Sequence, residues 1–237
     1  LKIPRRKACR FESGPGHQGL ARPVHGHSSV SPMPPIPPVT RALLIVCSAI
    51  FFLDAILLPM LGLRLGLQGL FALWPLPSGQ FWPWQVVTYG FLHGDMLHLF
   101  FNMLGLWMFG GELERLWGQR RYLMFLLAGV LAAAAVQMLV TSLVGSRVPT
   151  VGASGALFAL LLAFGMLFPH RTIVPLFPPI PMKARTFVMV FGGLELLFGF
   201  MGTGNVAHFA HLGGMLGGFL MIRYWRGQPP FSRRSRR

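Results

Sequence analysis

Long apolar stretches, separated by short polar or basic segments, fill most of this chain after residue 40. Six of them are candidate membrane spans: residues 41–62, 96–114, 121–143, 153–168, 186–201 and 206–222. A helix needs about 20 apolar residues to cross the hydrocarbon core of a bilayer, where backbone groups must bond to one another. The strict alternation of a membrane barrel strand is missing from these stretches. The pattern therefore predicts an all-α membrane protein, a bundle of six transmembrane helices.

The composition agrees with a chain that lies mostly in lipid. Hydrophobic residues make up 53% of it and charged residues 11%, whereas soluble domains carry roughly 25% charged residues. Ionisable side chains inside a span are costly, so each one marks a functional site by default. The few polar residues within the spans are therefore the candidate functional residues.

Basic residues gather on one side of the predicted bundle. Of the 21 Lys and Arg residues, only Arg64 and Arg147 fall in segments on the opposite side. Basic loops stay in the cytoplasm, so both termini are expected to be cytoplasmic. The net charge of +15 is then mainly a topology signal, and the Arg-rich C-terminus is expected to meet anionic membrane lipid, with no nucleic-acid partner.

The chain divides into three parts by composition. Residues 1–40 are rich in Pro, Ser, Gly, His and Arg, which predicts a disordered, basic N-terminal tail. Residues 41–223 hold the six spans, and residues 224–237 form a basic cytoplasmic tail. The two cysteines, Cys9 and Cys47, are too few and too far apart for a disulfide framework or a zinc ribbon.

Polar residues of three spans fall at one depth. Counted from the cytoplasmic ends at about 1.5 Å per residue, Ser154, Asn102 and His211 lie roughly 22, 20 and 18 Å into the bilayer. The hydrocarbon core is about 30 Å thick, so hydrolysis at that level requires a cavity open to water.

These residue types suit nucleophilic catalysis. A serine hydroxyl becomes a useful nucleophile when an imidazole takes its proton, and the resulting oxyanion needs hydrogen-bond donors. Ser154 supplies the hydroxyl, and Asn102 and His98, one turn apart, supply donors. The flanking Gly152 and Gly155 allow a substrate backbone to approach, and a helix beginning at Ser154 adds free amides.

The acidic residues do not complete a triad in this interpretation. Asp95 lies at the outer end of the second span and Glu195 belongs to another span, so the sequence predicts a Ser/His dyad. Asp54 and Glu195 are expected to form buried hydrogen bonds with neighbours. Glu112 and Glu114 fit either a solvated helix end or a structural network.

Two histidines compete for the role of base. His208 and His211 are three residues apart on one helix, about 4.5 Å along its axis, so depth does not separate them.

A structural explanation that involves no catalysis also fits Ser154, Gly152 and the histidines. Ser154 and Gly152 could form a small-residue contact between helices, and the histidines could hydrogen-bond to other helices. Such contacts are common in membrane bundles.

Three motifs in order along the chain resemble the rhomboid family of serine proteases, in its bacterial six-helix form. They are His98-Leu99-Phe100-Phe101-Asn102, Gly152-Ala153-Ser154-Gly155, and Ala210-His211-Leu212-Gly213-Gly214-Met215-Leu216-Gly217-Gly218. The Gly-x-Ser-Gly motif alone is weak, but its combination with the other two is specific. The resemblance covers residues 84–218.

The resemblance implies a role for each matching residue. Ser154 would attack the peptide carbonyl, and His211 would act as general base and then as general acid. The oxyanion would be held by the amide of Ser154 and the side chains of His98 and Asn102. The family spacing also selects His211 over His208 as the base.

Other residues are given supporting roles. Phe158 would pack against the catalytic imidazole, and Gly214 and Gly218 would let the last span press against the fourth. His93 is expected to brace the outer loop, and His208 to be a polar neighbour near the water cavity.

The expected function is an intramembrane serine endopeptidase that cuts transmembrane-segment substrates through an acyl-enzyme. The alternative is a catalytically idle relative that binds and escorts transmembrane helices. Imidazoles suit zinc, so a metal site or a transporter could use His98, His208 and His211. The chain has no His-Glu-x-x-His motif and no repeated half with broken helices, so no cofactor and no metal are expected. The six-span layout indicates a multi-pass protein of a bacterial inner (plasma) membrane.

Overall fold

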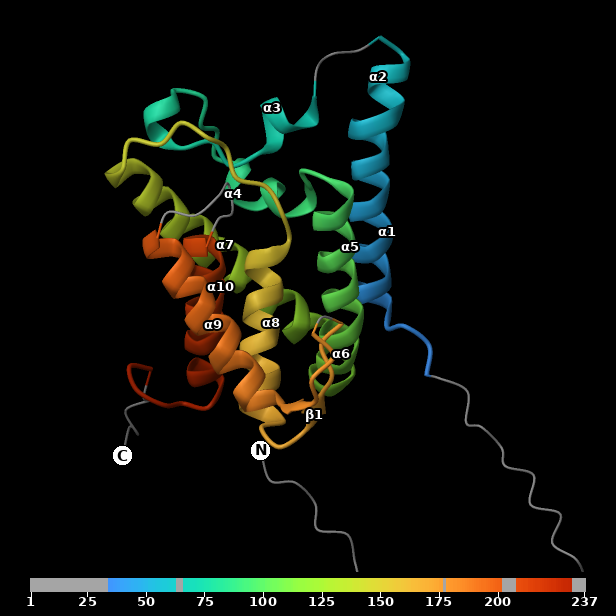
Figure 1. The fold of residues 1–237 in the computed structure, drawn as a ribbon, viewed down its shortest axis with the longest axis vertical. Coiled ribbons are helices and arrows are strands. Elements are labelled where there is room, and N and C mark those ends of the chain that lie inside the picture. Colours follow the sequence, from blue (N-terminus) through green and yellow to red (C-terminus); the bar gives the residue numbers. More distant parts are fainter. Residues whose placement is uncertain (1–33, 63–65, 177, 202–207, 232–237) are drawn as a thin grey trace, which may run out of the picture. The chain divides into compact units, whose positions relative to one another are not determined.

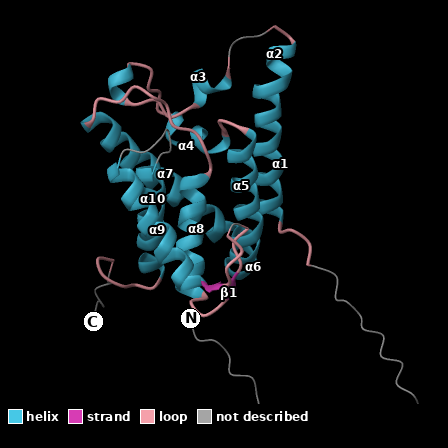
Figure 2. Cartoon of the chain, viewed as in Figure 1, coloured by secondary structure: helices cyan, strands magenta, loops and turns pink. Residues whose placement is uncertain are grey.

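The computed structural model describes residues 34–62, 66–176, 178–201 and 208–231, shown in Figure 1. Most of the predicted N-terminal tail therefore lies outside the described residues, as do residues 232–237 of the predicted C-terminal tail. The described residues from Pro35 onward form one compact unit. Helices make up nearly all of its regular structure (Figure 2).

The elements follow one another along the chain with short connections. The first part contains α1 (Pro38–Phe52), η1 (Leu53–Leu57), α2 (Leu58–Met60), α3 (Leu67–Phe71), η2 (Leu76–Ser78), α4 (Gln85–Thr88), η3 (Tyr89–Phe91), α5 (Met96–Gly105), η4 (Leu106–Gly110) and α6 (Gly111–Trp117). The second part contains α7 (Gln119–Leu143), α8 (Ser154–Leu167), β1 (Thr172–Ile173), β2 (Met182–Lys183), α9 (Ala184–Met201) and α10 (His208–Trp225). The two short strands pair antiparallel, with Thr172 opposite Lys183.

Each of the six predicted spans contains helix in its described part, which confirms the all-α membrane fold class. Within the described residues, three helices are long and apolar enough to cross a bilayer: Pro38–Met60, Gln119–Leu143 and Ala184–Met201. The helix Ser154–Leu167 is apolar but shorter. It begins at Ser154, the candidate nucleophile.

Glu114 belongs to a structural network and not to a solvated helix end. The helix α1 begins at Pro38, three residues before the predicted span, and its first amides lack intrahelical partners. The Glu114 carboxylate accepts hydrogen bonds from the amides of Val39 (2.9 Å) and Thr40 (2.7 Å) and from the Thr40 hydroxyl (2.8 Å). Only 3% of Glu114 is exposed. This contact fastens α6 to the start of α1.

Two other acidic residues also have partners. Glu112 forms an ion pair with Arg171, which precedes β1. The Asp54 carboxylate accepts a hydrogen bond from the amide of Leu67, the first residue of α3, at 2.6 Å. The expected hydrogen bond of Asp54 to a neighbour is confirmed, but Asp54 is half-buried and not buried as predicted.

A buried glutamine organises the loop between α2 and α5. Gln85 is fully buried, and its side-chain oxygen accepts a hydrogen bond from the amide of Trp74. Its amide nitrogen donates to the carbonyls of Leu70 and Gln80. One buried side chain therefore bonds to three backbone groups of this loop and holds them together.

The segment before α8 is held by backbone hydrogen bonds to that same loop. Leu73 and Thr150 exchange two of them, at 2.9 and 3.0 Å, and the amide of Gly152 donates to the carbonyl of Tyr89 at 2.9 Å. The Tyr89 hydroxyl in turn donates to the carbonyl of Val130 in α7. These contacts fix the chain just before the point where α8 begins.

Helices α7, α8 and α10 pack against one another, and glycines form their contacts. A side chain at Gly214 would bring its Cβ within 1.9 Å of the Gly155 carbonyl oxygen, and one at Gly218 would meet Ala159 and Phe125 at 3.0 Å. Small residues allow such close backbone approach between membrane helices. The start of α8 therefore lies directly against the first turns of α10.

We predict that Gly214→Ala destabilises the protein by about 1–3 kcal/mol, because the added methyl group meets a backbone atom and the two helices must separate. Gly193→Ala is the matched control, since a Cβ at Gly193 in α9 meets nothing within 4 Å. Thermal unfolding in detergent should show a lower Tm for Gly214→Ala alone. Equal Tm values for the two variants would contradict the packing described here.

Candidate active site

Ser154 and His211, from two different helices, meet in a hydrogen bond. The Ser154 hydroxyl oxygen lies 2.8 Å from His211 Nε2. Ser154 is the first residue of α8, and His211 lies in the first turn of α10. Only 8% of His211 is exposed. A serine paired with a mostly buried imidazole has the arrangement of an activated nucleophile.

The imidazole of His211 is stacked on an aromatic ring. Phe158, one turn after Ser154 in α8, lies with its ring centroid 4.3 Å from that of His211 and its plane tilted by 8°. A flat ring against one face prevents the imidazole from turning out of the plane that points Nε2 at the serine. Phe158 thus packs against the His211 imidazole, as the family resemblance implied.

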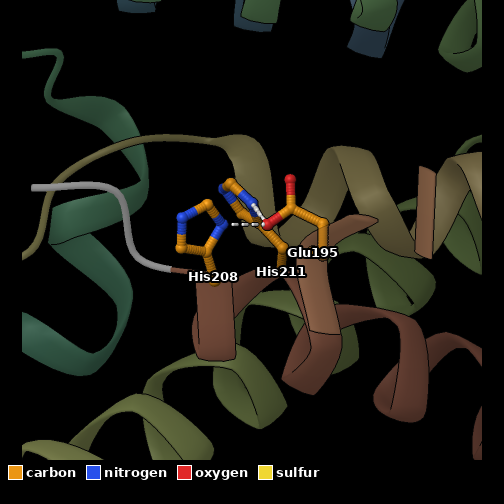
Figure 3. A group of neighbouring side chains, drawn as sticks. All are labelled: Glu195, His208 and His211. Carbon is orange, nitrogen blue, oxygen red and sulfur yellow. Dashed lines mark hydrogen bonds and ion pairs between the residues drawn. The ribbon is translucent and has the colours of Figure 1, made fainter. Parts of the chain in front are cut away.

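Glu195 lies on the other side of His211, and the expectation that no acid stands beside the base is wrong. Its Oε2 atom is 2.8 Å from His211 Nδ1 (Figure 3). The carboxylate oxygen lies off the direction of an Nδ1–H bond, so this nitrogen has no hydrogen-bond partner of regular geometry within the described residues. The expectation failed because packing of α9 beside α10 brings Glu195 to the histidine, and sequence spacing does not reveal that packing.

His208 shares the same carboxylate. Its Nδ1 atom lies 2.7 Å from Glu195 Oε2, and Figure 3 shows both imidazoles converging on that oxygen. The structure therefore distinguishes the two histidines that depth in the membrane leaves equivalent. His211 reaches Ser154 with Nε2, whereas Nδ1 of His208 contacts Glu195.

His98 lies next to Ser154 across Gly152. Gly152 has a φ of +125°, and a Cβ there would come within 2.6 Å of His98 Nε2 and 3.5 Å of the Ser154 hydroxyl oxygen. Only glycine takes that backbone angle without strain and leaves room for the imidazole. The start of α5 is fixed by Asp95, which accepts a hydrogen bond from the His98 amide at 2.8 Å.

Asn102 is buried beside the same region. It is 3% exposed, and its side-chain nitrogen donates to the carbonyl of His98 at 2.9 Å. It lines an apolar cavity of about 340 Å³ together with Ala153, Ala156 and Leu157. Because Ala153 precedes Ser154, the cavity extends from Asn102 to the start of α8.

His93 is buried in the loop before α5, and 3% of it is exposed. Its ring packs on that of His98, with centroids 5.2 Å apart and planes at 68°. Burial and, to a smaller extent, the neighbouring His98 lower the pKa of His93 to about 4. A neutral His93 at pH 7 therefore packs behind the His98 imidazole.

The sequence interpretation expected Glu195 to hydrogen-bond a neighbour, and it does so with His208, but the sequence did not identify that neighbour. Glu195 is an acid in an apolar helix, and such a residue marks a functional site by default. That signal was present, but it does not say which neighbouring helix the carboxylate faces. The separation of Glu195 from both histidines along the chain hides a contact that α9 and α10 make side by side.

Comparison with known proteins finds a match to the Rhomboid domain over residues 80–227, more than half of the chain. The Rhomboid protease GluP of Bacillus subtilis is 35% identical over 136 residues, which cover 57% of this chain and 25% of that protein. Rhomboid protein 1, mitochondrial, of Saccharomyces cerevisiae is 30% identical over 57% of this chain and 40% of its own length. The Rhomboid protease GlpG of Yersinia enterocolitica is 27% identical over 94% of this chain and 74% of its own length. The chain thus spans about a quarter and two-fifths of the first two relatives.

We predict that Gly152→Ala slows the reaction of Ser154 with a fluorophosphonate, a reagent for activated serine hydroxyls, by about 100-fold. A misplacement of about 1 Å has that effect on rates, and the added methyl group pushes directly on His98 and Ser154. Gly79→Ala is the matched control, because Gly79 also has a positive φ of 72° but open space around it. Equal labelling rates for the two variants would show that the geometry around Gly152 is not needed.

Proposed function

Because this chain belongs to the rhomboid family, we propose that it is an intramembrane serine endopeptidase that cuts transmembrane segments of other proteins. One observation supports this most strongly: the Ser154 hydroxyl oxygen lies 2.8 Å from His211 Nε2. Further support comes from the setting of this pair, since both residues lie on apolar helices of a membrane bundle. A substrate that reaches them is itself a membrane segment.

In the first step, His211 Nε2 takes the hydroxyl proton as the Ser154 oxygen attacks the carbonyl carbon of the scissile peptide bond. The carbonyl oxygen becomes an oxyanion. The amide of Ser154 is available to it, because the first amides of a helix have no intrahelical partner. The side chains of His98 and Asn102, which lie around Gly152 and the adjoining cavity, supply the other donors.

In the second step, the tetrahedral intermediate collapses. The peptide C–N bond breaks, His211 gives its proton to the departing amine, and an ester links the substrate to Ser154. Water then attacks this acyl-enzyme while His211 again accepts a proton. That proton returns to the Ser154 oxygen as the carboxylic acid leaves, so the enzyme is regenerated.

Glu195 assists as a positioning residue behind the base. Its carboxylate lies 2.8 Å from His211 Nδ1, so it favours the tautomer with a proton on Nδ1 and leaves Nε2 free to accept the serine proton. It also offsets the positive charge that His211 acquires during the reaction. The proposed Ser/His dyad therefore works with a third group, from α9.

The chain is an integral membrane protein, and we place it in a bacterial plasma membrane. The bacterial GlpG relative, which matches 94% of the chain, supports this location. Its substrates are expected to be single-span or other transmembrane proteins. The exposed apolar side chains of the helices would contact the surrounding lipid.

We predict that purified parent protein in detergent cuts a single-span model substrate, and that Ser154→Ala and His211→Ala each reduce kcat by at least about 1,000-fold. Loss of either nucleophile or base removes most of the acceleration in serine hydrolases. Cleavage is followed by gel and mass spectrometry, with Ser142→Ala as the control for loss of a hydroxyl outside the site.

If the folded parent binds several such substrates and cuts none of them, the protease assignment is wrong. The idle rhomboid-like protein, which binds and escorts transmembrane helices, then becomes the better description. Retained cleavage in Ser154→Ala would also overturn the assignment, because it would move the nucleophile elsewhere.

We further predict that Glu195→Gln lowers kcat by at least about tenfold and leaves KM nearly unchanged, since the carboxylate acts on the base and not on bound substrate. Glu195→Asp should recover part of the rate. Glu112→Gln is the control, because it removes a carboxylate that pairs with Arg171 away from the site. A fall in Tm with kcat unchanged for the remaining folded protein would give Glu195 a purely structural role.

A further inference from the structure

Three potential metal ligands meet at the junction of α9 and α10. Glu195, His208 and His211 each offer one donor atom, and these atoms lie within 4.8 Å of one another (Figure 3). Their side chains are 10–15% exposed, so the cluster is shielded from bulk water without being sealed. Two imidazoles and one carboxylate form a donor set that zinc uses with a water as fourth ligand.

The spacing of the donors suits a bound ion after a small adjustment. Zinc bonds of about 2.1 Å in a tetrahedral site place donors about 3.4 Å apart. Glu195 Oε2 now lies 2.7 Å from His208 Nδ1 and 2.8 Å from His211 Nδ1, close to that separation. Rotation of the Glu195 side chain, which has three rotatable bonds, would open both gaps.

One nitrogen of the cluster lacks a regular partner. His211 is more than nine-tenths buried, and within the described residues its Nδ1 has no hydrogen bond of normal geometry although it faces the Glu195 carboxylate. A buried polar atom without a partner is costly. A cation bound between the imidazole and the carboxylate would give His211 Nδ1 a partner. It would also bind Glu195 Oε2 and His208 Nδ1.

From this geometry we propose that Glu195, His208 and His211 bind a divalent transition-metal ion of the zinc class, and that the bound ion switches off Ser154. The switching part rests on the proposed function. Nitrogen donors select zinc-like ions over magnesium and calcium, which prefer oxygen. The ion is an inhibitor here, so the catalytic steps still require no metal.

The inhibition follows from the single proton of a neutral imidazole. When a metal binds Nδ1 of His211, that proton must sit on Nε2, which faces the Ser154 hydroxyl at 2.8 Å. An Nε2 that already carries a proton cannot accept one from the serine. The metal also withdraws the Glu195 carboxylate from its place behind the imidazole. Both effects remove the general base while leaving the fold intact.

The binding test uses full-length Ser154→Ala protein, so that no cleavage is needed. Zinc chloride binding is measured by equilibrium dialysis for this protein and for the same protein carrying His208→Gln, Glu195→Gln or His170→Gln. We expect His208→Gln and Glu195→Gln each to lose one zinc site, or to bind zinc there at least about tenfold more weakly. His170 is exposed and lies outside the cluster, so His170→Gln should lose no zinc site. Equal binding by all four proteins would overturn the site. Counting the difference between variants cancels any zinc held by histidines elsewhere in the chain.

The inhibition test uses the cleaving parent protein. Zinc should inhibit it, EDTA should restore the rate, and magnesium at the same concentration should have no effect. The inhibitory zinc concentration, taken relative to each variant's own zinc-free rate, should rise at least about tenfold in His208→Gln and stay unchanged in His170→Gln. The same inhibitory concentration in both variants would place the inhibitory ion elsewhere and overturn the proposal.

The two tests separate the metal site from the protease assignment. Zinc binding that depends on His208 and Glu195, in a protein that cuts no substrate, supports the site and rejects the protease. Cleavage without cluster-dependent zinc binding supports the protease and rejects the site. A Tm for His208→Gln equal to that of the parent shows that this variant is folded. Glu195→Gln in the binding test is a second, independent substitution at the same site.

Discussion

The close approach of α8 and α10 holds the candidate site together. Gly155 and Gly214 bring the two backbones so near that a single methyl group at Gly214 would overlap a carbonyl oxygen. Only at this distance can the Ser154 hydroxyl, on the first residue of one helix, meet His211 in the first turn of the other. Lipid supplies no hydrophobic drive for helices to associate, so contacts between small residues carry this arrangement. Packing and chemistry therefore depend on the same glycines.

The polar groups inside this apolar bundle are satisfied mainly by helix ends and by one another. Glu114 receives the free amides at the start of α1, and Gln85 satisfies three backbone groups of the loop before α5. The Glu195 carboxylate instead serves two histidines. A buried acid with hydrogen-bonding backbone around it is a structural element. In the proposed mechanism, a partly buried acid between two imidazoles, one of which faces a serine, is a group whose charge acts on the chemistry.

The proposed cluster of Glu195, His208 and His211 has two states, one without a metal ion and one with a metal ion bound. With a proton on His211 Nδ1, the Glu195 carboxylate supports the imidazole as a base for Ser154. With a metal ion on that nitrogen, the proton is confined to Nε2 and the serine loses its base. The proposed cleavage reaction needs only the first state. The second depends on His208, which contributes a further nitrogen without an assigned role in cleavage, and it would make the cleavage rate depend on the concentration of free metal ions.

The sequence by itself determined the helices, their order and the residues that match the family motifs, because apolar length and local spacing are properties of neighbouring positions. Ser154, His98, Asn102 and His211 could be named on that basis. The tertiary structure decided which partners they meet: the pairing of His211 with Glu195, the sharing of that carboxylate by His208, and the role of Glu114 at the start of α1. Each of these contacts joins different helices, and the direction in which a side chain faces across a helix interface follows from packing and not from spacing along the chain.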